Sequence, residues 1–143
     1  MNIEQIQDDI TRSTLGDTND LIPPYDEEDG DDQKLNATYR ALRRSISLKN
    51  RLITLVNAYY LGKIMAQAEK EEAAKYRNKV TAHYLRRASK TFDLFEQCPT
   101  QILLTRSLTI ERIASLKRSE ITLLRQQMLE YFVGTQILEE ENC

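Results

Sequence analysis

The sequence is poor in the residues from which catalytic and metal sites are most often built. Among its 143 residues are one histidine, two cysteines, four glycines and no tryptophan. A zinc site usually needs four cysteine or histidine ligands, and the chain holds three such residues in all. A catalytic triad would have to use His83, and no glycine-rich loop is present to cradle phosphates. We therefore predict a protein that is not an enzyme and that uses no metal ion, cofactor or small-molecule substrate.

Disulfide and membrane signals are equally sparse. The two cysteines, Cys98 and Cys143, do not make a disulfide framework, and a reducing compartment is the simpler interpretation. No apolar run approaches the roughly 20 residues that a membrane span needs. Residues 1–10 carry acids where a secretory signal has bases. We expect an intracellular protein, nuclear or cytoplasmic, without a membrane span.

The charges that are present are separated along the chain. Residues 1–33 contain eleven acids and one base, which gives a net charge of −10, whereas residues 34–138 carry a net charge of +11. Three glutamates follow in residues 139–143. A segment so acidic and so poor in apolar residues cannot bury a core. We predict a disordered acidic tail at 1–33, a basic helical domain at 34–138 and an acidic C-terminal end.

Within the basic domain, apolar residues recur at helical spacing and prolines are scarce. Residues 34–65 predict one amphipathic helix whose apolar seam has a single gap at Lys49. Gly62 inside it indicates close packing or a bend. The polar segment 67–72 predicts a break, and a second helix then continues until shortly before Pro99.

The remaining segment also predicts helices. Thr100 and Thr109 are plausible N-caps, residues 110–133 fit one long helix or two shorter ones, and Gly134 suits a C-terminal stop. The fold expected is therefore all-α, with three to four amphipathic helices in a small antiparallel or irregular bundle. Alternatively, an unpaired apolar seam associates with another chain.

Two apolar surfaces are candidates for binding a protein partner. The first is a helical repeat in the acidic segment, made by Ile3, Ile6 and Ile10. It is typical of a segment that folds into a partner's groove, or it is simply a few apolar residues in a disordered tail. The second is an extra stripe on the first predicted helix, made by Leu48, Leu52, Leu55 and Tyr59. These features favour a non-enzymatic helical interaction protein, a small subunit or adaptor of a larger intracellular complex, or a protein that self-associates.

The alternative function is DNA or RNA binding, because arginine-rich helix faces suit phosphate backbones. The candidate bases are Arg40, Arg43, Arg44, Arg51, Lys79, Arg86, Arg87, Lys90, Lys117, Arg118 and Arg125. On any single helix these bases are equally typical of an ordinary solvated surface. The acidic tail would compete with an anionic partner, since it is tethered to the same chain.

Overall fold

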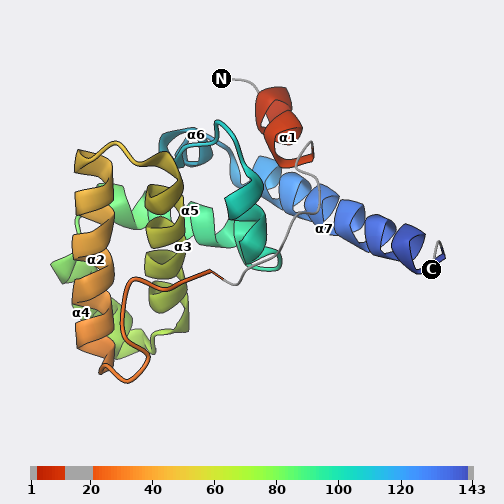
Figure 1. Cartoon of the computed structure of the whole chain (residues 1–143). Helices are drawn as coiled ribbons and strands as arrows, with labels where there is room; N and C mark the ends of the chain where they lie inside the picture. The colour runs from red at the N-terminus through yellow and green to blue at the C-terminus, as the bar shows by residue number, and fades with distance from the viewer. Residues whose placement is uncertain (1–2, 12–20, 142–143) are drawn as a thin grey trace.

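The structure, a computed structural model, describes residues 3–11 and 21–141, with side chains described for residues 3–7 and 21–130. Within these ranges the chain forms helices and no strands, so the all-α prediction is confirmed. The elements are α1 (Ile3–Thr11), α2 (Asp31–Ser47), α3 (Arg51–Gln67), α4 (Lys70–Lys79), α5 (Ala82–Phe95), the 3₁₀-helix η1 (Pro99–Leu104), α6 (Ile110–Ala114) and α7 (Arg118–Glu141). The described chain thus has more and shorter helices than the three or four expected (Figure 1).

Residues 34–65 form two helices, so the prediction of one continuous helix is wrong. The chain reverses at Lys49, which has a φ of 55°, and α2 and α3 then pack side by side (Figure 1). The Asn50 side chain accepts a hydrogen bond from the Ile53 backbone N–H at 3.1 Å and caps α3. The Asn50 N–H in turn donates to the Ser45 carbonyl at 3.0 Å, which closes the end of α2. The gap in the apolar seam is therefore a turn.

The core is centred on α3, which packs against α2 on one side and α5 on the other. The side chains of Leu55 and Leu61 are fully buried. A Cβ added at Gly62 would overlap the Ala88 carbonyl oxygen and lie 2.6 Å from the Phe92 Cβ. Of the two interpretations of this glycine, close packing is the one that the structure shows.

The predicted second helix is also divided. The break expected at 67–72 is confirmed, because α3 ends at Gln67 and α4 begins at Lys70. A further break at Val80 and Thr81, which periodicity did not predict, separates α4 from α5. The Thr81 hydroxyl lies 2.9 Å from the Tyr39 hydroxyl of α2, so this turn is anchored to the neighbouring helix.

The helix caps predicted in the C-terminal half are confirmed in part. The Thr109 hydroxyl accepts from the Arg112 N–H at 3.3 Å and caps α6, as expected. Thr100 caps no helix, because η1 already begins at Pro99. The sequence left open whether residues 110–133 form one helix or two. The structure has two helices there, α6 and α7, and α7 continues through Gly134. The predicted stop there is wrong, since one glycine costs a helix only about 1 kcal/mol.

The segment expected to be a tail contains structure where it is described. α1 packs on α7, with Ile6 only 2% exposed and the Gln7 side-chain amide donating to the Gln127 side-chain oxygen at 2.8 Å. The Tyr60 hydroxyl donates to the Leu21 carbonyl at 2.9 Å, which ties this segment to α3. Helix α2 begins at Asp31, three residues before the predicted boundary. Residues 12–20 lie outside the described chain.

Candidate interaction surfaces

The lone histidine of the chain lies beside an arginine on α5. His83 is exposed, and its Nδ1 lies 2.8 Å from Nη1 of Arg87, one turn along α5. Within residues 3–11 and 21–141, no group of three or more His, Cys, Asp and Glu side chains could hold a metal ion. Across the same residues, no helix is both long and apolar enough to cross a membrane.

An apolar groove lies where the α2–α3 turn faces the segment 21–24. It encloses about 690 Å³ between these elements and η1. Its lining consists of Leu21, Ile22, Pro23, Pro24, Ala41, Arg44, Ser45, Leu48, Asn50, Leu52, Ile53, Val56, Asn57 and Leu103. The fraction exposed is 84% for Ile22, 67% for Leu48 and 50% for Ile53. These are the three most exposed large apolar side chains in the described chain, and all three line the groove.

The polar groups in the floor of the groove are already engaged. The Ser45 hydroxyl donates to the Leu42 carbonyl at 2.8 Å, and the Asn57 side-chain amide donates to that hydroxyl at 3.4 Å. The Asn50 side chain is occupied in capping α3. The surface offered to a ligand is therefore mainly apolar. Tyr60 holds the outer wall in place through Leu21.

The predicted apolar stripe is only partly available for binding. Leu48 and Leu52 line the groove, whereas Leu55 and Tyr59 are core residues with 0% and 5% exposure. Ile6 is also buried, within the chain itself, and the side chain of Ile10 lies outside the described part. Sequence reasoning missed the contribution of residues 21–24, because a proline pair in an acidic segment gives no sign of which helix it contacts.

Three exposed arginines, Arg40, Arg43 and Arg44, follow α2 beside the groove, and we call them the α2 arginine ridge. With Asn36 and Tyr39 they surround a shallow hollow of about 550 Å³. The Arg43 guanidinium lies 5.6 Å from the centre of the Tyr39 ring, and within the described residues no ridge arginine pairs with an acid. Residues 34–68 contain no aspartate or glutamate. Arg44 lines both the hollow and the groove.

A second group of predicted bases converges between α5 and α7. Arg86, Lys90, Arg118 and Arg125 line a pocket of about 420 Å³. The remaining candidates lie apart from both groups. Lys79 and Lys117 are exposed, and Arg87 contacts His83.

Arg51 has a structural position that the sequence did not indicate. Its guanidinium donates to the Thr105 carbonyl at 2.7 Å and to the Leu108 carbonyl at 3.0 Å. A third hydrogen bond reaches the Thr105 hydroxyl at 3.0 Å. These bonds join the start of α3 to the linker between η1 and α6, so Arg51 stabilises the fold and offers few donors to a ligand.

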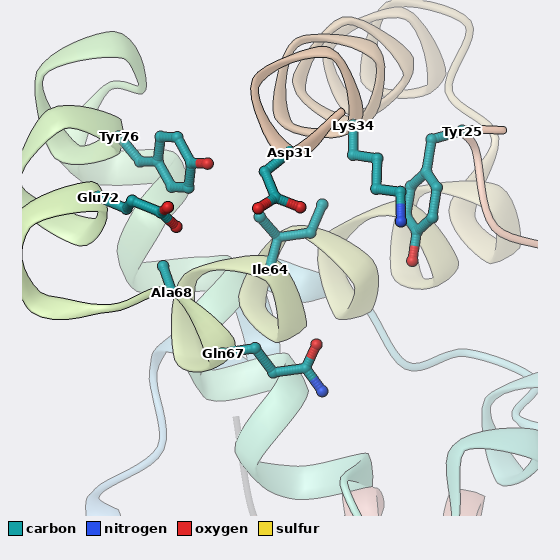
Figure 2. A pocket seen from close by; sticks show the side chains of 8 residues that line it. All are labelled: Tyr25, Asp31, Lys34, Ile64, Gln67, Ala68, Glu72 and Tyr76. Carbon is teal, nitrogen blue, oxygen red and sulfur yellow. The ribbon is translucent and has the colours of Figure 1, made fainter. Parts of the chain in front are cut away.

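Figure 2 shows a smaller pocket of about 110 Å³ where α2, α3 and α4 meet. Its polar side chains are of mixed charge: Asp31 and Lys34 come from α2, and Glu72 comes from α4. Burial raises the pKa of Tyr76, and the nearby Glu72 and other acids add to the shift. The Lys34 amine lies 5.3 Å from the centre of the Tyr25 ring. Opposite charges and a small volume are typical of a packing junction between helices.

Comparisons with protein-family models, with curated proteins and with solved structures find no match. The function of this chain must therefore be inferred from its own surfaces. Of the pockets described above, the groove encloses the largest volume, and it joins exposed apolar side chains to the α2 arginine ridge.

Proposed function

We propose that the protein is a non-enzymatic helical interaction protein, an adaptor or small subunit of a larger intracellular complex. Its groove between the α2–α3 turn and residues 21–24 binds an amphipathic helix of a protein partner. The observation that carries the proposal is the exposure of Ile22, Leu48 and Ile53 around one concave surface. Apolar side chains gathered in this way mark protein-binding sites more often than scattered ones do. A groove between helical walls suits a helix that presents apolar residues at spacings of three and four.

The charges around the groove define the partner further. Arg44 lies at its edge, Arg40 and Arg43 continue the ridge, and no acid occurs in residues 34–68. An approaching helix with acidic residues beside its apolar stripe gains favourable interactions with these arginines and is attracted from a distance. A helix with basic flanks is repelled. The partner segment is therefore acidic as well as amphipathic.

The apolar contacts are sufficient to make the interaction measurable. Complete burial of a leucine or isoleucine side chain contributes about 1.5–3 kcal/mol. Leu48 and Ile53 are 67% and 50% exposed, so burying the remainder contributes on the order of 1–2 kcal/mol each. Because 1.4 kcal/mol corresponds to a tenfold change in affinity, loss of either contact should be clearly detectable.

A designed peptide tests the proposal directly. The peptide is a helix with leucines at spacings of three and four and with glutamates on both flanks, and its affinity for the full chain is measured by calorimetry. Leu48→Glu and Ile53→Glu should each weaken binding roughly tenfold or more. The matched control is Leu123→Glu, because Leu123 is 45% exposed on α7 and lines no part of the groove. Equal affinities for the Leu48 and Leu123 variants would contradict the proposal.

Cross-linking from position 48 can identify the natural partner. A photo-reactive amino acid replaces Leu48 in the full chain, and a second protein carries it at Leu123 as the control. The segment cross-linked only from position 48 should be amphipathic and rich in aspartate and glutamate. Cross-linking to nucleic acid, or to a segment with basic flanks, would reject the groove as a site for an acidic helix.

Nucleic-acid binding is a second candidate function, and it is favoured because no arginine of the α2 arginine ridge forms an ion pair with a described residue. If these arginines contact phosphates, replacing Arg40, Arg43 and Arg44 with glutamine should weaken binding to a duplex uniformly across sequences. The slope of log affinity against log salt concentration is negative, and it should become less steep by up to about three. A triple variant with unchanged binding and salt slope excludes the ridge from this function.

A further inference from the structure

Helices α5 and α7 each contribute one largely polar stripe to the lining of a pocket. The stripe on α5 consists of Arg86, Ser89, Lys90 and Asp93, and the stripe on α7 consists of Arg118, Ile121, Thr122 and Arg125. In each stripe the residues are spaced by three, four and seven, so they share one helix face. Together they enclose the pocket of about 420 Å³, which shares no residue with the groove.

The lining of this pocket is mainly polar and basic. Ile121 is the one large apolar side chain among these eight residues, whereas the same two helices contribute Phe92, Phe95, Leu124 and Met128 to the apolar core. Four of the eight are basic and one is acidic. Burial, and then repulsion from the nearby Arg86, lowers the pKa of Lys90. An anion in the pocket would relieve the repulsion.

Two of the bases are already engaged by the protein. The Lys90 amine donates to the Leu116 carbonyl at 2.6 Å and to the Ala114 carbonyl at 2.8 Å, at the end of α6. Arg125 donates to the Asp93 carbonyl at 3.1 Å and lies 3.6 Å from the Glu96 carboxylate. These contacts fix the walls of the pocket.

The other two bases keep most of their donors free. Arg86 makes one long hydrogen bond, at 3.5 Å, to the Ala114 carbonyl. Arg118 makes no side-chain hydrogen bond or ion pair with the described residues. Each guanidinium has five N–H donors in a planar fork, so this edge of the pocket has capacity to bind an anion.

We infer that the pocket between α5 and α7 binds a small molecule that carries a phosphate group. Guanidinium forks from Arg86 and Arg118 match phosphate oxygens in pairs, and the hydroxyl of Ser89 adds one more donor, whereas the Thr122 hydroxyl already donates to the Arg118 carbonyl at 3.0 Å. A phosphate offsets more of the excess positive charge than a single carboxylate does. The volume of about 420 Å³ falls within the range of small-molecule sites. A nucleic-acid strand is usually bound by a positively charged groove that follows its backbone, whereas these bases surround one hollow.

The test uses inorganic pyrophosphate and the full chain labelled with ¹⁵N. Amide resonances of residues 86–93 and 118–125 should shift in a saturable manner as pyrophosphate is added. The double variant Arg86→Gln/Arg118→Gln should bind at least roughly tenfold more weakly. The control is Arg77→Gln, which removes one positive charge, as Arg86→Gln and Arg118→Gln each do, because Arg77 is exposed on α4 and lines none of these pockets. It should bind like the unaltered protein.

Three results would overturn the inference. The first is the absence of saturable shifts in α5 and α7, and the second is equal weakening by Arg77→Gln and by the double variant. The third is a single-stranded oligonucleotide that shifts the same resonances and that pyrophosphate does not displace, which would assign these bases to nucleic acid. The amide spectrum also reports whether the double variant folds. If it does not, Arg118→Gln alone is titrated, and an affinity equal to that of the unaltered protein rejects the site.

Discussion

At Gly62 the backbone of α3 comes so close to α5 that even one added carbon would disturb both helices. The atom in the way is the carbonyl oxygen of Ala88, which belongs to a helix backbone and cannot turn aside as a flexible side chain would. A substitution here therefore has to separate the two central helices of the core.

We expect Gly62→Ala to lower the free energy of unfolding by about 1–3 kcal/mol, as overpacked core substitutions do. The gain in helix propensity, about 1 kcal/mol, offsets part of the steric cost. Urea unfolding followed by circular dichroism measures the change. Gly30→Ala is the control, because a Cβ at Gly30 meets no atom within 4 Å and the substitution costs only a weaker helix cap. A Gly62→Ala protein as stable as the original would show that α3 and α5 separate freely.

Arg51 shows the limit of sequence-based prediction for a single residue. Its basic neighbours on the predicted helix made it a candidate for binding phosphates, yet its donors reach backbone carbonyls of residues 105 and 108. Backbone acceptors have no signature in the sequence, so this contact could not be predicted. Leu55 and Tyr59 were misassigned for a related reason, because periodicity shows which residues share a face but not whether that face is covered.

At the scale of the helices, the sequence predicted the type of structure better than its boundaries. Apolar spacing was enough to predict an all-α fold and the break at 67–72. The turns at Lys49 and Thr81 contain neither glycine nor proline, and tertiary contacts help to fix them. Asn50 was the one local signal available at the first turn, because asparagine is a strong N-cap. The groove depends on this turn, so its position could not be predicted either.

The α2–α3 turn gives a prediction about backbone strain. Lys49 has a φ of 55°, a conformation that costs most residues roughly 1–2 kcal/mol and glycine very little. Lys49→Gly removes this strain but also gives the unfolded chain more conformational entropy, which opposes folding. The net effect should be a rise of about 0.5–1 kcal/mol in the free energy of unfolding. Lys49→Ala keeps the strain and should leave the stability nearly unchanged. The comparison of the two variants by urea unfolding separates strain from the loss of the lysine charge, and equal stabilities would indicate that the turn is not strained.

At the scale of the whole molecule, acids and bases are concentrated in different parts of the sequence, and few of the described side chains form ion pairs. At the start of α2, Asp32 pairs with Lys75 of α4 at 3.2 Å, and Lys34 pairs with Glu27 of the preceding segment at 3.9 Å. All four side chains are near the surface, and such pairs contribute little to stability. The bases of α2 and of the α5–α7 pocket are left with few acidic partners. The net charge of the chain, −2, thus conceals two surfaces suited to anionic ligands.

The packing of α1 on α7 predicts a separable unit at one end of the molecule. Ile6 is 2% exposed and lies outside the contact between α3 and α5. Ile6→Glu should release α1, because it places a charge in an apolar contact, while the central helices keep their structure. Hydrogen exchange should then speed up for amides of residues 3–7 and near Gln127 but remain slow in α3 and α5. Uniformly faster exchange throughout the chain would mean that α1 is part of the main cooperative unit.

The contact between Gln7 and Gln127 joins residues that are 120 positions apart in the chain. Closing so long a loop is entropically costly, whereas the pairing of α2 with α3 and of α3 with α5 needs only short loops. During synthesis on the ribosome, α1 emerges before α7, the helix on which it packs. Until α7 has been made, the isoleucines of α1 are therefore accessible to a chaperone or to an early binding partner.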